Sequence, residues 1–150
     1  MVKTCFVFDL DGTLADSNHR LHHIQKTPKD WGEYFRACWA DSPIAHMVMI
    51  MRAVAANHDI FICSGRSDEV RGQTMKWLAL HIPDIDFKTD DVYMRVAGDH
   101  RPDDVIKLEM LEHLKLRGYI VLAAFDDRDR VVAAWRAAGV PCLQVAPGDF

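Results

Sequence analysis

Cysteine pairs at metal-binding or redox spacing are missing from this chain. The four cysteines are scattered, with no CxxC pair, at Cys5, Cys38, Cys63 and Cys142. His19, His22 and His23 cluster in the sequence, but they have no partner His or Cys at zinc-finger spacing. Free cysteines in apolar runs behave as small core residues. We therefore expect a reduced, cytoplasmic protein without disulfides or zinc.

Positive charge and long apolar runs are also scarce. The formal net charge is −4, so no global basic field can hold a nucleic-acid backbone, although a few arginines could still recognise one terminal phosphate. No apolar run reaches the length of a membrane span, and the first residues lack a signal-peptide pattern. A GxxxxGK[ST] loop is absent, so we expect no ATP site.

The order of apolar runs and helical patterns predicts a single α/β domain. A chain of 150 residues with 49% hydrophobic content can bury one real core. The apolar runs are continuous rather than alternating, as in a parallel sheet covered on both faces. Strands are expected at residues 4–8, 60–63, 92–94, 119–125 and 142–145. Helices are expected between them at residues 44–57, 68–81, 103–117 and 131–138. This alternation predicts a doubly wound sheet with right-handed crossovers.

Residues 14–43 do not follow this alternation, and we expect them to form a small helical cap after the first strand. Trp31, Tyr34, Phe35 and Cys38 recur at the spacing of one helix face. Such a stripe most often packs into a core. The alternative is a cap over the active site that offers an aromatic wall to a base or a sugar. The two interpretations overlap, since a cap helix must also pack.

Two pairs of aspartates follow two of the expected strands. Asp9 and Asp11 end the first apolar run, and Asp126 and Asp127 end the run at 121–125. In an open parallel sheet, ligands bind beyond the carboxyl ends of the strands. Crowded carboxylates repel one another unless a cation or a proton intervenes, and Mg²⁺ prefers carboxylate oxygen. All four aspartates are therefore candidate Mg²⁺ ligands, Asp126 and Asp127 directly or through water.

Phosphoryl transfer is the chemistry that this set of groups favours. Asp9 could attack phosphorus to give an aspartyl-phosphate, while Asp11 could donate a proton to the leaving oxygen and later recover one from water. Mg²⁺ would offset the repulsion between carboxylate and phosphate. Lys107, early in an expected helix, would bind a phosphate oxygen and restrain Asp9. The hydroxyl of Ser64 and nearby backbone N–H groups would hold another oxygen.

Each of these residues also has an ordinary structural interpretation. Acid pairs at loop starts are often turn residues or helix caps. Ser64 and Gly65 by themselves suit a turn before a helix, and Lys107 by itself suits a solvated helix face. Their convergence on one edge of the expected sheet is what favours a catalytic site.

The motifs resemble, in full order, those of the haloacid dehalogenase superfamily. They are Asp9-Leu10-Asp11-Gly12-Thr13, Ser64, Lys107 and Asp126-Asp127. The resemblance implies a Rossmann-like sheet of order 3-2-1-4-5 and Mg²⁺ dependence. With Asp at position 11, it also implies phosphatase chemistry.

A closer resemblance is to the 3′-phosphatase domain of phage polynucleotide kinase–phosphatases. It is carried by Ser64-Gly65-Arg66, by residues 98–107 and by residues 126–150. This resemblance implies that Arg66 and Arg128, with Gly65 and Thr13, bind the phosphate or the nucleotide end. Residues 31–39 do not match that family, so the resemblance says more about the chemistry than about the choice of substrate.

The expected function is therefore that of an Mg²⁺-dependent phosphomonoesterase that removes a 3′-phosphate from a polynucleotide end. One alternative keeps the chemistry and takes free nucleoside monophosphates. Another, by analogy of fold alone, takes sugar phosphates. An alternative of a different class is a non-catalytic module that binds phosphorylated ends.

Overall fold

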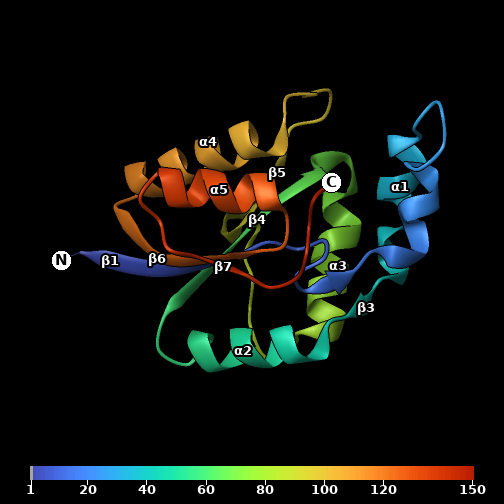
Figure 1. The fold of residues 1–150 in the computed structure, drawn as a ribbon. Coiled ribbons are helices and arrows are strands. Elements are labelled where there is room, and N and C mark those ends of the chain that lie inside the picture. The colour runs from blue at the N-terminus through green and yellow to red at the C-terminus, as the bar shows by residue number, and fades with distance from the viewer. Residues whose placement is uncertain (1) are drawn as a thin grey trace.

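A five-stranded parallel sheet forms the centre of the fold (Figure 1). The computed structural model describes residues 2–150. The strands of this sheet are β1 (Lys3–Phe8), β4 (Asp59–Ser67), β5 (Val92–Arg95), β6 (Tyr119–Asp126) and β7 (Cys142–Gln144). Their spatial order is β5-β4-β1-β6-β7, and every neighbouring pair is parallel. When only these five strands are counted along the chain, the order is 3-2-1-4-5, so the predicted topology is confirmed.

Helices cover both faces of the sheet, as the alternation of patterns predicted. The four are α2 (Ala45–Ala55), α3 (Arg71–His81), α4 (Asp103–Leu116) and α5 (Asp129–Ala137). The first two pack on one face and the last two on the other (Figure 1). The α/β class and the doubly wound arrangement are therefore confirmed.

The helix boundaries differ a little from expectation. α4 and α5 end near Gly118 and Gly139, whose φ angles of 86° and 84° lie in the left-handed region that favours glycine after a helix. α3 begins at Arg71 rather than at residue 68, because Asp68–Val70 form a separate 3₁₀ helix, η3. A further 3₁₀ helix, η4 (Thr89–Asp91), directly precedes β5.

Two apolar clusters hold the layers together. On the α2 and α3 face, Phe8 and Phe125 come from neighbouring strands and stack with ring centroids 4.3 Å apart. On the opposite face, the buried Trp135 of α5 belongs to a cluster that includes apolar side chains of α4. All four cysteines are buried and free, and they pack as small apolar groups. Within residues 2–150, no helix is both long and apolar enough to span a bilayer.

β4 is longer than predicted, and this changes the setting of Ser64, Gly65 and Arg66. The sequence pattern predicts a strand that stops at residue 63 and a turn after it. In the structure β4 continues to Ser67, which pairs with Arg95 of β5 after a register irregularity. The register irregularity lets β5 resume its pairing with β4 on the far side of Gly65. The ordinary interpretation of Ser64 and Gly65 as a turn before a helix is therefore wrong.

A series of short elements lies between β1 and α2 in the chain. It contains β2 (Ala15–Asp16), η1 (Asn18–His23), α1 (Trp31–Arg36), η2 (Ala37–Ala40) and β3 (Ser42–Pro43). β2 and β3 pair antiparallel, which brings the two ends of this series together. α1 stands beyond one end of the sheet, next to α3 (Figure 1). We call residues 14–43 the insert.

The aromatic stripe of the insert is only partly buried. α1 ends at Arg36 and Cys38 belongs to η2, so the stripe does not lie on one continuous helix as predicted. The last turn of a short helix commonly tightens into 3₁₀ geometry, which satisfies its final carbonyl groups. Tyr34 and Cys38 are 7% and 0% exposed, whereas Trp31 is 45% exposed. Core packing therefore accounts for Tyr34 and Cys38 but not for the open surface of Trp31.

Candidate active site

Three buried carboxylates meet where β1 and β6 end. Asp9 directly follows β1, Asp126 is the last residue of β6, and Asp127 comes next. One oxygen from each lies within 4.8 Å of the others. The N–H of Asp9 donates to the carbonyl of Phe125 at 2.9 Å, which continues the parallel pairing to this edge. The structure thus brings together three of the predicted acids, and we call them the carboxylate group.

Lys107 reaches the carboxylate group from early in α4. Its Nζ lies 2.7 Å from Asp9 Oδ1 and 2.6 Å from Asp126 Oδ2, and the side chain is buried. Burial alone would lower the pKa of Lys107, but the charges of Asp126 and Asp9 outweigh it and hold this pKa well above its usual range. Lys107 therefore stays protonated and shares its charge between two acids.

The carboxylate group holds more negative charge than Lys107 can offset. Burial and the charge of Asp126 raise the pKa of Asp9 well above its usual range despite Lys107. The same two causes raise the pKa of Asp127 to about 6. Such a set of converging carboxylate oxygens fits a hard divalent cation such as Mg²⁺.

The loop after β1 fixes the carboxylate of Asp9. The hydroxyl of Thr13 donates to Asp9 Oδ2 at 3.1 Å, while Lys107 binds Oδ1. Gly12 has a φ angle of 80°, and a Cβ atom there would lie 2.1 Å from Asp127 Oδ2. Only glycine therefore leaves room for the Asp127 carboxylate beside this loop. Thr13, expected as a substrate contact, uses its hydroxyl to hold Asp9.

Asp11 is bound by two arginines and lies outside the carboxylate group. Its Oδ1 accepts hydrogen bonds from Nη2 of Arg20 and Nη2 of Arg66, each at 2.5 Å. Burial opposes the charged form, but the positive charges of Arg66 and Arg20 outweigh it and lower the pKa of Asp11. Asp11 is therefore held as a carboxylate in this arrangement.

Asp41 completes this second ionic cluster from the far end of the insert. It accepts from Arg20 Nε at 2.9 Å and Nη2 at 2.7 Å, and from Arg66 Nη2 at 3.2 Å. His19 Nε2 lies 2.7 Å from Asp41 Oδ1. The two arginines and Asp41 are buried, and with Asp11 they form a cluster of balanced charge. This cluster ties the insert to β4 beside the carboxylate group.

Sequence reasoning assigned no role to Arg20, beyond a possible place in a pocket, and none to Asp41. Neither residue belongs to a recognisable motif, and 21 positions separate them in the chain. The one signal in the sequence is that Arg20 and His19 stand in a stretch without acids, from residue 17 to residue 29. That signal indicates a basic surface rather than a buried ion pair.

Ser64, Gly65 and Arg128 make local contacts near the start of α4. Ser64 is buried, and its Oγ accepts from the backbone N–H two residues further on at 3.1 Å. Asp103 fills the space beside Gly65, where a Cβ atom would meet Asp103 Oδ1 at 2.6 Å. Arg128 Nη1 donates to Asp103 Oδ2 at 2.5 Å. Asp103, which the sequence did not single out, therefore orients Arg128 together with the Phe150 carbonyl, which accepts from Arg128 Nε at 2.6 Å.

Known structures share this fold. The class C acid phosphatase from Bacillus anthracis superposes with a TM-score of 0.67 at 15% identity, over 99% of this chain and 67% of that chain. A haloacid dehalogenase-like hydrolase from Streptococcus pneumoniae gives 0.62 at 14% identity, over 95% and 84%. At such identities the likeness concerns the fold alone. The sheet order is the one that the resemblance to the haloacid dehalogenase superfamily implies, and three acids of its motifs stand together at the strand ends.

A family model identifies the branch of this class. The model of the polynucleotide kinase PNKP phosphatase domain matches residues 3–150, so the chain belongs to that family and is a phosphatase. The predicted resemblance is thus confirmed. A chain of the Pnkp1/Rnl/Hen1 RNA repair complex superposes with a TM-score of 0.80 at 28% identity, over 99% of this chain and 44% of that chain.

A viral protein is similar in sequence. It is named "Putative bifunctional polynucleotide kinase/RNA ligase", from Autographa californica nuclear polyhedrosis virus, and is 27% identical over 137 residues. The match covers 90% of this chain and 18% of the viral protein. The chain therefore spans less than half the length of these two relatives.

Proposed function

We propose that this phosphatase is Mg²⁺-dependent and removes a 3′-phosphate from a polynucleotide end through an aspartyl-phosphate intermediate. The observation that carries the proposal is the setting of Asp9, which is held at both oxygens beside Lys107 and two further acids. The family match and the RNA repair complex that contains a similar chain support a nucleic-acid end as substrate.

Asp9 is the proposed nucleophile. Lys107 and Thr13 fix its carboxylate, so the attacking oxygen meets phosphorus in a defined orientation. The bond from Asp9 to phosphorus forms as the ester P–O bond breaks, and the electron pair leaves with the 3′-oxygen. The Lys107 ammonium offsets negative charge at the transferring group. Mg²⁺, held by the carboxylate group, would neutralise charge on the phosphate oxygens.

Asp11 is the proposed proton carrier. It donates a proton to the leaving 3′-oxygen, and as a carboxylate it takes one from the water that hydrolyses the aspartyl-phosphate. Its ion pairs with Arg20 and Arg66 suit the second step, because they stabilise the carboxylate. In the first step Asp11 must be protonated, which its pairing with two arginines opposes. We therefore propose that the substrate phosphate competes with Asp11 for Arg66.

The remaining predicted contacts are proposed to act at the same edge of the sheet. Arg66 and Arg128 would bind the phosphate or the nucleotide end, with the Ser64 hydroxyl and the Gly65 backbone beside them. Arg128 is the more accessible arginine, since its side chain is 26% exposed. We also propose that the insert serves as a cap, because Arg20 and Asp41 anchor it next to Asp11.

A substrate panel tests this function. In the presence of Mg²⁺, a 3′-phosphorylated oligonucleotide should be hydrolysed with a kcat/KM about tenfold above that of a 3′-mononucleotide, because binding of the remote part of a substrate can lower the barrier. Phosphate release is the measurement. Turnover of 5′-mononucleotides alone would make the enzyme a nucleotidase, and turnover of sugar phosphates alone would exclude a nucleotide substrate. Binding of phosphorylated ends without turnover would contradict the enzymatic role.

Mg²⁺ is expected to stabilise the fold, because a cation would relieve the repulsion within the carboxylate group. At a concentration one hundred times Kd, a ligand of the native state adds about 2.7 kcal/mol, which raises Tm by roughly 5–10 °C for a domain of this size. EDTA should reverse the shift and abolish phosphate release. Thermal melting with and without Mg²⁺ checks the first expectation.

The variant Asp127→Asn should show a smaller Mg²⁺ shift, since it removes one charged oxygen donor. Asp90→Asn is the matched control, because Asp90 is exposed on η4 and should keep the full shift. Equal shifts in the two variants would exclude Asp127 from the metal site.

A further inference from the structure

Trp31 stands beside a hollow in the insert. The hollow has a volume of about 540 Å³ and is lined by the seven consecutive residues 26–32. The indole contacts Tyr34 edge-on and lies nearly parallel to Phe35, with centroid distances of 5.7 and 5.9 Å. Two rings therefore hold Trp31 in position, while almost half of its surface remains open to a ligand.

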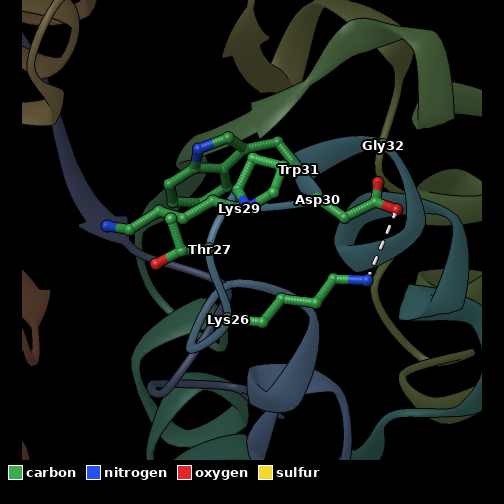
Figure 2. Close-up of a pocket in the computed structure, with 7 residues that line it drawn as sticks. Lys26, Thr27, Lys29, Asp30, Trp31 and Gly32 are labelled. Carbon is green, nitrogen blue, oxygen red and sulfur yellow. Dashed lines mark ion pairs between the residues drawn. The ribbon is translucent and has the colours of Figure 1, made fainter.

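Two lysines border the same hollow. Figure 2 shows Lys29 running alongside the Trp31 indole, and Lys26 on the opposite side with its ammonium turned toward Asp30. Lys29 Nζ lies 5.7 Å from the centre of the Trp31 ring. Lys26 and Asp30 are 3.9 Å apart with side chains 55% and 39% exposed, so their pair is weak. Within residues 2–150 no carboxylate forms an ion pair with Lys29, and Lys26 is held only by its weak pair with Asp30, which an anion can replace.

The residues that lead into the hollow are basic in a chain that is acidic overall, and the lining itself holds two lysines and one acid, Asp30. Between residues 17 and 29 the sequence has no Asp or Glu, yet it has three histidines, Arg20, Lys26 and Lys29. The whole chain carries a formal net charge of −4. Proteins bind single-stranded nucleic acid by pairing phosphates with basic groups and stacking bases on open aromatic rings. An acidic peptide would use the charge but offers no matching base for the indole.

A continuous series of contacts joins the hollow to Asp11. Trp31 contacts Tyr34, whose ring covers the Arg20 guanidinium at 4.3 Å. Arg20 in turn donates to the Tyr34 carbonyl at 3.1 Å and to Asp11 at 2.5 Å. Only Tyr34 and Arg20 therefore separate Trp31 from Asp11 in this series of contacts.

We propose that residues 26–32 form a subsite for the strand that precedes the terminal phosphate. Trp31 stacks on one base, and Lys26 and Lys29 bind backbone phosphates. The proposal rests on the proposed function, since a polynucleotide offers both bases and backbone phosphates next to its 3′ end. The subsite would account for binding of the nucleotide strand, which the catalytic motifs leave unexplained.

Kinetics on substrates of increasing length test the stacking role of Trp31. The probes are a 3′-mononucleotide and 3′-phosphorylated di-, tetra- and octanucleotides. Trp31→Ala should raise KM for the octanucleotide about tenfold, the loss expected for one stacked base. It should leave kcat, and all constants for the mononucleotide, unchanged. Trp31→Phe keeps an aromatic ring and should recover most of the octanucleotide affinity, which separates stacking from a folding defect.

Salt dependence tests the two lysines. Each phosphate contact to a single strand contributes about 0.7 to the slope of log affinity against log salt, so the variant Lys26→Ala/Lys29→Ala should reduce that slope by about 1.4. Lys115→Ala is the matched control, because Lys115 is exposed near the end of α4 and should leave the slope unchanged. Thermal melting of all variants verifies that they fold.

Binding of a labelled octanucleotide with a 3′-hydroxyl end, followed by anisotropy, separates this subsite from the catalytic proposal. Weaker binding by Trp31→Ala would support the subsite even if no 3′-phosphate were hydrolysed. Equal binding and equal KM in wild type and Trp31→Ala would overturn the subsite and leave the phosphatase proposal standing. Absence of both binding and oligonucleotide turnover in the wild type would overturn both.

Discussion

Replacing Asp9 with asparagine is expected to lower kcat on the order of 10⁴-fold or more, a loss typical of removing a nucleophile. The amide has the same shape, and its one oxygen can still accept from Lys107, while its NH2 group faces the Thr13 hydroxyl and can donate to it. Its oxygen is too weak a nucleophile to attack phosphorus, so no aspartyl-phosphate forms. Single-turnover phosphate release from a 3′-phosphorylated oligonucleotide is the measurement.

Stability distinguishes this chemical loss from a folding defect. Burial and the charge of Asp126 raise the pKa of Asp9, so its charged form is unfavourable in the folded protein. A neutral residue of equal size removes that cost, and Asp9→Asn should melt at or above the wild-type temperature in EDTA. Asp90→Asn, at an exposed position, should keep wild-type kcat and Tm. Full activity of Asp9→Asn would refute Asp9 as the nucleophile.

The acids at the strand ends could be predicted because a local pattern, an apolar run followed by an acid, indicates their positions. Asp9 and Asp126 each close an apolar run, and parallel strands deliver their carboxyl ends to the same edge. Lys107 could be predicted for a related reason, since a helix that follows a strand runs back from that edge and begins beside it. Its contacts with both acids are those that this topology allows.

The ionic cluster around Asp11 could not be predicted in the same way. Arg20 and Asp41 come from irregular parts of the insert, and no periodic pattern relates them to Arg66 on β4. Their pairing depends on how the insert folds back on itself. The antiparallel pairing of β2 with β3 fixes this by joining the two ends of the insert. Buried ion pairs of this kind are set by tertiary geometry rather than by sequence spacing. For the same reason Asp11, expected with the other acids, is found with arginines instead.

Gly65 shows how a local signal can mislead. A serine and a glycine after an apolar run are typical of a turn, but β5 pairs beyond them and keeps the strand going. The glycine is required for a different reason, because Asp103 occupies the space that a side chain would need. That close approach comes from α4, which is distant in the sequence, so only the structure reveals it.

Replacing Lys107 with methionine is expected to affect both stability and catalysis. Methionine keeps the length of the side chain but leaves Asp9 and Asp126 without their shared positive charge. Breaking a buried ion pair from one side costs about 3–5 kcal/mol, so Tm in EDTA should fall by at least several degrees. Loss of one fixed charge at the transferring group should lower kcat by about 10²–10³-fold. Thermal melting and steady-state phosphate release measure the two effects.

The response of this variant to Mg²⁺ connects the two effects. A cation in the carboxylate group offsets the repulsion that Lys107 relieves in the wild type, so Mg²⁺ should raise the Tm of Lys107→Met more than that of the wild type. Activity should not recover with it, because a metal that balances charge does not replace the donor that orients Asp9. Lys115→Met, on the exposed face of the same helix, should stay within about 0.5 kcal/mol of the wild type. A Lys107→Met protein that melts like the wild type in EDTA would mean that the buried acids are neutral in the fold, and Lys107 would then have no charge to balance.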